Sequence, residues 1–211
     1  MPSHSVLVGH RFAAASVATS GQQPPEIVEL SVVTIDSGAI SSAPLTWVGC
    51  PTRPVTSHAA RGYGIREADL TGRPPFAAMA GDVTAVLDGR RLVAHGAAVV
   101  TDALCAELPA LRPAGVLDTL PLARRIWPGA APRSLPELLG RAGLRVRGAG
   151  GHTQWNAEAT ARLFLYLVDK LADQVQDLTC ERLFRIAAPY RQRWVSPAAP
   201  VSGSPGGQSS T

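Results

Sequence analysis

Two long runs of β-forming residues near the start of the chain constrain the fold more than any other feature. Residues 11–19 read RFAAASVAT, residues 26–36 read EIVELSVVTID, and a Gly-Gln-Gln-Pro-Pro segment separates them. Apolar, β-branched runs on either side of a turn predict a hairpin of two strands. A third short strand is expected over residues 45–50. We therefore expect a sheet that begins with consecutive strands.

Further along, the pattern changes to strands that alternate with helices. Pro51, Pro54 and the glycines at 62 and 64 predict a long connection after the third strand. The apolar run 91–95 predicts a strand, and Ser134 with Glu137 forms the capping-box pattern that opens a helix. Helical spacing covers residues 65–70, 75–87, 99–111, 118–126, 135–142 and 156–173. This order predicts an α/β layered domain.

Length and charge set broad limits on the class of protein. With 211 residues, 45% of them hydrophobic, the chain is long enough for one domain with a sizeable core. The formal net charge is +4, and Lys170 is the only lysine, so arginine carries nearly all of the positive charge. Arginine binds phosphate bidentately, so the excess favours a polyanionic partner. An ordinary basic surface explains the same charge equally well.

The cysteines and the apolar segments bear on the compartment. Cys50, Cys105 and Cys180 are isolated and odd in number, which fits a reduced cytosol and predicts a cytoplasmic protein. The Ala-rich run 12–18 resembles the end of a signal peptide, but His10 and Arg11 interrupt it too early. No stretch approaches the length of a membrane span, so no membrane partner is expected.

A series of short motifs follows one another in a fixed order. SVATSG at residues 16–21 precedes EIVELSVV, YGIREADL follows at 63–70, and LVAHGAAVV at 92–100. DTLPLARR comes next at 118–125, and then His152, Asn156 and the run AEATA at 157–161. This order resembles the DEDDh (DnaQ-like) 3′–5′ exonucleases, the family of the proofreading subunit of bacterial replicative polymerase and of oligoribonuclease-like RNases. The corresponding family motifs are D-x-E-T-T-G, H-G-I-x-x-x-D-L, L-V-A-H-N-A-x-F-D and H-x-x-x-x-D.

The resemblance implies a ribonuclease H-like exonuclease fold, in which helices flank a central mixed β-sheet. We expect this domain over residues 9–176, after a short arm at 1–8. Residues 177–195 form an Arg/aromatic extension, and the Ser/Pro/Gly-rich residues 196–211 are predicted to be a disordered tail because they lack apolar side chains.

In this family four carboxylates bind two Mg²⁺ or Mn²⁺ ions, which activate water at the scissile phosphate. The four acidic positions fall on Ser16, Ala18, Val100 and Asn156, none of which is a carboxylate. No Asp or Glu occurs between Met1 and Pro25, so the first strand supplies no acid in any register. We therefore expect no functional catalytic residue, no metal site and no cofactor.

Several other residues are candidates for the missing chemistry. His152 corresponds to the family's general base, although it lies one residue closer to Asn156 than the pattern requires, and without metals a role in capping the loop is the favoured interpretation. Asp102 and Glu158 each lie two positions beyond a position where the family has a metal ligand, which on a helix turns the side chain away from the site. Glu29, on the second strand, is expected to have a structural role.

Nucleic-acid contacts are predicted at Thr19, His95, Arg182, Arg185, Arg191 and Arg193. Arginines interleaved with aromatic residues can form a stacking and phosphate-binding patch. Equally, residues 178–194 can form a helix whose Phe184, Ile186 and Tyr190 pack on the domain while its arginines are solvated. The same two interpretations apply to the arginines at 124, 125, 141, 145 and 147.

The leading hypothesis is a pseudo-exonuclease that binds nucleic acid or a protein partner without cutting. One alternative is an active 3′–5′ exonuclease of DNA or RNA that uses relocated acids. The other is a protein-interaction scaffold that has no nucleic-acid role. Fold does not by itself carry function, so the sequence leaves these three open.

Overall fold

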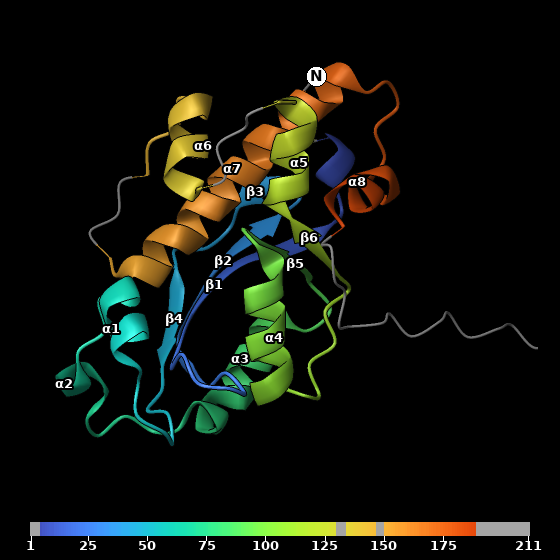
Figure 1. Ribbon diagram of the computed structural model, residues 1–211. Helices are drawn as coiled ribbons and strands as arrows, with labels where there is room; N and C mark the ends of the chain where they lie inside the picture. Colours follow the sequence, from blue (N-terminus) through green and yellow to red (C-terminus); the bar gives the residue numbers. More distant parts are fainter. Residues whose placement is uncertain (1–4, 130–133, 147–149, 189–211) are drawn as a thin grey trace, which may run out of the picture.

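The structure is a computed structural model that describes residues 5–129, 134–146 and 150–188. Its centre is a mixed sheet (Figure 1) with the order β3-β2-β1-β5-β6, and β4 also pairs with β2. The hairpin strands β1 and β2 are antiparallel, whereas β1, β5 and β6 run parallel. The predicted mixed sheet is therefore confirmed. The strand bounds are β1 Arg11–Thr19, β2 Ile27–Asp36, β3 Ala39–Ile40, β4 Leu45–Val48, β5 Arg91–Ala94 and β6 Gly115–Asp118.

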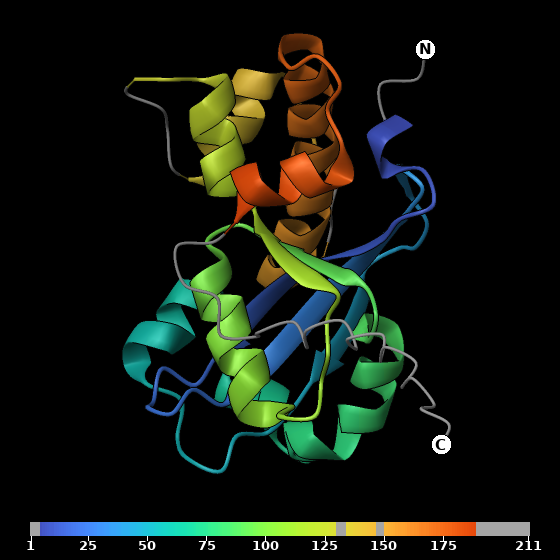
Figure 2. The same ribbon diagram turned by 90° about the vertical axis from the view of Figure 1, so that its right-hand side faces the viewer.

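Helices cover both faces of this sheet (Figures 1 and 2), as expected for a ribonuclease H-like fold. Alternate residues of β1 point to opposite faces, because successive side chains of a strand alternate. Phe12 and Ala14 pack in one buried cluster with residues of α5 to α8, whereas Ala13, Ala15 and Val17 pack in the other with residues of η2, α3 and α4. The helix bounds on the first face are α5 Thr119–Ile126, α6 Leu135–Ala142, α7 His152–Gln174 and α8 Cys180–Ala187; those on the second are η2 Phe76–Met79, α3 Ala80–Leu87 and α4 Ala97–Glu107.

Some elements were not predicted from the sequence. The expected long connection contains helix α1 Ser57–Tyr63, which Thr56 caps by accepting a hydrogen bond from the Ala59 amide. Strand β6 was not predicted, and only its last residue, Asp118, was expected to begin a helix, because four residues are too few to show a period. Helix α7 begins at His152, four residues before the expected start at Asn156. Helix α2 Glu67–Leu70 lies within the expected range, and η1 Ser5–Leu7 precedes the sheet.

Both ends of the described chain pack against the domain. Leu7, from the predicted N-terminal arm, is fully buried in the cluster that contains Phe12. Leu183 of α8 is also fully buried there, and Phe184 and Ile186 pack against the same cluster. The interpretation of this segment as a packed helix is therefore confirmed up to residue 188. Residues 189–211, with Tyr190, Arg191, Arg193 and the predicted disordered tail, lie outside the described residues, and the proposed boundaries of the domain stay predictions.

Within the described ranges, no helix combines the length and the apolar character that spanning a membrane requires.

Candidate functional site

A pocket of about 380 Å³ opens beside the carboxyl end of the hairpin strand β1. Five elements contribute to its wall: β1, the turn after β5, and the helices α4, α6 and α7. Its lining residues are Ala15, Ser16, Val17, His95, Gly96, Val99, Val100, Leu135, Pro136, Asn156 and Thr160. The structure thus brings together three of the four positions that the resemblance assigns to catalytic acids.

The fourth position, Ala18, lies on β1 just beyond the pocket and is 1% exposed. It is directly paired with Glu29 of β2, and the register shifts between Ala18 and Thr19, which marks a β-bulge. Bulges are frequent next to functional sites because they redirect the strand. Ser16 and Ala18 are two residues apart, so both side chains point toward the face that α7 covers.

The pocket wall carries polar side chains without a carboxylate and is partly apolar. Ser16, Asn156 and Thr160 offer hydroxyl and amide groups, and Val99, which is 55% exposed, adds an apolar surface. None of the residues that line this pocket is an Asp or a Glu. In the described part of the chain, no three His, Cys, Asp or Glu side chains are grouped so that they could hold a metal ion. These residues do not match the carboxylate set that the resemblance implies.

The turn between β5 and α4 is held in place by Asp118, at the end of β6. Its carboxylate accepts hydrogen bonds from the amides of Gly96 (3.0 Å), Ala97 (2.8 Å) and Leu120 (2.9 Å). Gly96 has a φ of 72°, in the left-handed region that favours glycine. His95 hydrogen-bonds through Nδ1 to the hydroxyl of Thr119 at 2.8 Å. The loop that carries His95 into the pocket is therefore fixed by a buried acid that sequence reasoning did not single out.

A second polar group joins β2 to the first turn of α7. The Thr153 hydroxyl donates to the Glu29 carboxylate, and its oxygen lies 2.8 Å from the Ser31 hydroxyl. Ser31 in turn lies 2.9 Å from the hydroxyl of Thr46 on β4. These contacts hold the N-terminus of α7 against the sheet, so they set the position of Asn156 one turn later. The expected structural role of Glu29 is consistent with this bonding.

The other candidates for relocated chemistry lie outside the pocket. The Glu158 carboxylate accepts a 2.9 Å hydrogen bond from Arg162 on the same helix. Asp102 lines a neighbouring pocket, together with Thr19 and Cys105. His152 is exposed, and its ring lies edge-on to that of Tyr63, with centroids 5.7 Å apart. None of these three residues lines the pocket that contains Ser16 and Asn156.

The predicted nucleic-acid contacts are scattered over the molecule. His95 lines the pocket, and Thr19 lines its neighbour. Arg182 and Arg185 are exposed on α8, which packs on α5 and β6 away from the residues of the pocket wall. Arg191 and Arg193 lie outside the described residues.

A mixed sheet flanked by helices, with a cleft formed by β1, α4 and α7, defines a ribonuclease H-like exonuclease domain. The sequence pattern of the RNase_T exonucleases matches residues 16–156, a span that begins at Ser16 and ends at Asn156. The chain belongs to the RNase_T exonuclease family.

Relatives with known names and structures fit this assignment. The chain is 29% identical to the 3′-5′ exonuclease DinG of Bacillus subtilis over 185 residues, which cover 84% of the chain and 19% of that protein. It therefore spans about a fifth of this relative's length. The structure of Exonuclease X in complex with 5′ overhanging duplex DNA aligns with a TM-score of 0.63 and 23% identity, covering 83% of this chain and 99% of that one. A zinc-bound complex of E. coli Exonuclease I with single-stranded DNA aligns with a TM-score of 0.63 and 15% identity, covering 83% and 42%.

These comparisons correct the expectation that no cofactor is involved. Exonucleases of the family to which the chain belongs use divalent metals. The Exonuclease I complex is itself a zinc-bound form. The expectation was wrong because it took the identity of four side chains as a statement about the cofactor, whereas divalent-metal use is a property of the family that matches residues 16–156.

Proposed function

We propose that this chain is a pseudo-exonuclease, a member of the RNase_T family whose cleft binds the end of a nucleic-acid strand without cutting it. The observation that carries the proposal is the composition of the cleft, which has no Asp or Glu among its lining residues. In the family, cleavage depends on carboxylates at positions that here correspond to Ser16, Ala18, Val100 and Asn156. Phosphoryl transfer depends on stabilising charge around the scissile phosphate, and these side chains supply none.

Binding of nucleic acid is supported by what the cleft retains. Ser16 and Asn156 can hydrogen-bond to sugar and base edges, and Val99 presents an exposed apolar surface to a base. Carboxylates would repel a phosphate backbone, so their absence favours binding. The net charge of +4 acts in the same direction.

An active exonuclease with a relocated acid is the second candidate function. Glu29 is paired with Ala18 across the hairpin, so its side chain is on the same face of the sheet as the position of the family's second acid. Against this candidate, the Glu29 carboxylate is already hydrogen-bonded to Thr153 and does not line the pocket.

Nuclease assays on purified protein separate these functions. We expect 3′-labelled single- and double-stranded DNA and RNA to stay intact in Mg²⁺ or Mn²⁺, and the same oligonucleotides to raise the anisotropy signal on binding. Trimming that EDTA stops, and that persists through further purification, would overturn the proposal. Glu29→Gln, Asp102→Asn and Glu158→Gln would then identify the acid, with the exposed Asp82→Asn as the matched control.

Two further experiments test whether the cleft binds nucleic acid and whether added carboxylates restore cleavage. If no oligonucleotide binds at low salt, a protein-interaction role is favoured and the nucleic-acid role is wrong. The variant that combines Ser16→Asp, Ala18→Glu, Val100→Asp and Asn156→Asp is expected to gain metal-dependent trimming. Divalent ions should raise its melting temperature more than that of the wild type, because Ala18→Glu places a carboxylate opposite Glu29 and like charges in that position repel.

We also propose the cytoplasm as the compartment. Cys50 follows β4, Cys105 lies in α4 and Cys180 begins α8, so the three are distributed over separate elements. This distribution does not resemble the disulfide framework of a secreted domain.

A further inference from the structure

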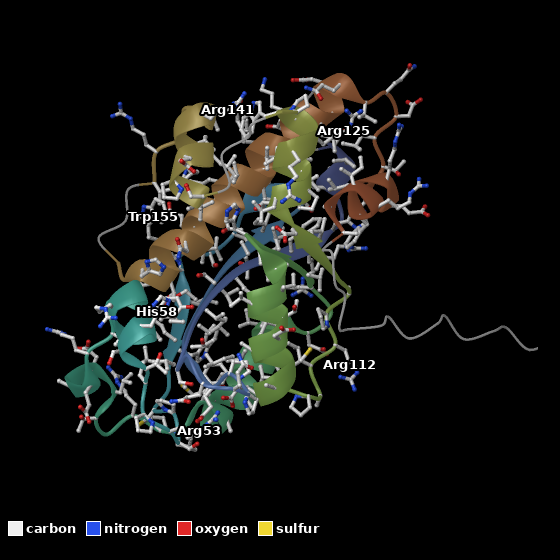
Figure 3. The ribbon with its side chains drawn as sticks, in the orientation of Figure 1. Arg53, His58, Arg112, Arg125, Arg141 and Trp155 are labelled. Atoms are coloured by element: carbon white, nitrogen blue, oxygen red, sulfur yellow. The ribbon has the colours of Figure 1, made fainter. Side chains whose placement is uncertain are left out.

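One end of the molecule carries arginines that the cleft does not use. Arg124 and Arg125 occupy the last turn of α5, Arg141 occupies the last turn of α6, and Arg145 follows that helix. All four are exposed. Figure 3 shows Arg125 and Arg141 at this end, with Arg53 and Arg112 toward the other. We call these four residues, Arg124, Arg125, Arg141 and Arg145, the arginine end.

Stacked rings and cations give the arginine end a fixed geometry. The Arg141 guanidinium lies 5.2 Å from the ring centroid of Trp127, at the C-terminus of α5. Trp127 stacks on Tyr166 of α7 with centroids 6.0 Å apart and an interplanar angle of 28°. The Lys170 amine lies 5.8 Å from the Tyr166 centroid. A guanidinium held on an indole loses less conformational freedom on binding a ligand than a mobile side chain does.

The four arginines of this end are not neutralised within the described residues, whereas Lys170 beside them pairs with Asp173 at 3.5 Å. Arg124, Arg125, Arg141 and Arg145 form no ion pair with an acid in residues 5–129, 134–146 and 150–188, whereas Arg53, Arg66, Arg90 and Arg162 each do. A group of exposed, unneutralised arginines attracts a polyanion, and guanidinium forks match phosphate oxygens.

Helix α6 connects the arginine end to the cleft. Its first residues, Leu135 and Pro136, line the pocket, and Arg141 lies near its other end. Six residues of helix span about 9 Å, which is the length of about three stacked nucleotides.

We propose that the arginine end binds the phosphate backbone of the same strand whose terminus occupies the cleft, several nucleotides away from that terminus. This inference rests on the proposed function of the cleft and adds a second contact surface to it. The Trp127 ring already has Arg141 and Tyr166 as partners, which leaves it less able to stack on a base. The occupant is therefore recognised by its phosphates, so binding at this surface is independent of base sequence.

Salt-dependent binding of fluorescent single-stranded oligonucleotides tests the proposal. A variant with Arg124→Gln, Arg125→Gln, Arg141→Gln and Arg145→Gln is expected to bind a 15-nucleotide strand about tenfold or more weakly. Its slope of log affinity against log salt should become shallower by about 0.7 for each phosphate that the variant no longer neutralises. A dinucleotide, which is shorter than the path of about three nucleotides from the cleft to Arg141, should bind the variant and the wild type equally.

Controls separate this surface from the cleft and from effects on folding. Arg112→Gln removes an exposed arginine at the other end of the molecule and should leave both the affinity and the salt slope unchanged. Cations in the last turn of a helix also stabilise that helix, so the melting temperature is measured for every variant. Unchanged affinity and slope for the long strand, in a folded variant, would overturn the proposal. If the wild type binds no strand at all, the function proposed for the cleft fails as well.

Discussion

Two neighbouring regions differ in their acidic side chains: the residues that hold the loops and helices around the cleft, which we call the scaffold, include bonded carboxylates, whereas the residues that line the cleft include none. Asp118 accepts three backbone hydrogen bonds, and Glu29 accepts one from Thr153. At the positions of Ser16, Val100 and Asn156, no acid is present. Asp118 and Glu29, the two carboxylates discussed here, therefore both accept hydrogen bonds from donors of the protein itself. The acids described here position loops and helices, and the residues that line the cleft include no Asp or Glu.

The largest expected effect tests the scaffold side of this comparison. Asp118→Asn replaces an oxygen acceptor with an amide donor that faces a backbone N–H, in a side chain that is only 7% exposed. We expect a loss of about 2–4 kcal/mol in the free energy of unfolding, measured by urea denaturation. The exposed Asp82→Asn should change it by less than about 0.5 kcal/mol. Equal losses of unfolding free energy in Asp118→Asn and Asp82→Asn would show that the hydrogen bonds of Asp118 do not stabilise the fold.

A second scaffold acid, at the other end of the hairpin, gives a smaller and pH-dependent effect. The Arg90 guanidinium, 2.6 Å from the Asp36 carboxylate, lowers the pKa of that carboxyl below its ordinary value of 3.8. Asp36→Asn leaves the buried Arg90 without its acidic partner, so we expect a loss of about 1–2 kcal/mol at pH 7, discounted because Asp36 is partly exposed.

The sign of the pH dependence follows from the lowered pKa of Asp36. Its contribution is fully present above the unfolded value near 3.8 and is lost as the pH falls through the lower pKa of the folded state. The difference in unfolding free energy between the wild type and Asp36→Asn should therefore be constant at neutral pH and shrink below that value. A difference that stayed constant down to about pH 2 would show that the ion pair does not stabilise the fold.

The smallest effect on stability is expected in the cleft. Asn156→Asp adds a charge to a partly exposed side chain of the pocket wall, so the free energy of unfolding should change by less than about 0.5 kcal/mol. Oligonucleotide binding should weaken several-fold, because the new carboxylate repels phosphate. Ala85→Glu, at an exposed position of α3, a helix that contributes no residue to the cleft wall or to the arginine end, is the charge-matched control and should bind as the wild type does. A large loss of stability in Asn156→Asp would mean that Asn156 belongs to the scaffold.

Local sequence was enough to predict much of the fold. The β1–β2 hairpin, the capping box of Ser134 with Glu137 and the packed face of α8 depend on residues close in the chain, whose spacing encodes them directly. Helix α1 and strand β6 were not predicted, because short elements carry little periodicity and depend on tertiary contacts.

The sequence by itself determined the family, since each motif is a short continuous run of residues. It also determined that the first strand has no acid, since no Asp or Glu precedes Glu26. Only the tertiary structure decided which of the remaining acids are bonded into the scaffold. Ser31 and Thr153 are 122 residues apart in the chain, and Arg141 meets Trp127 across two helices. Such partners are brought together by the burial of apolar faces on both sides of the sheet. This packing depends on segments far apart in the chain, so no short segment predicts it.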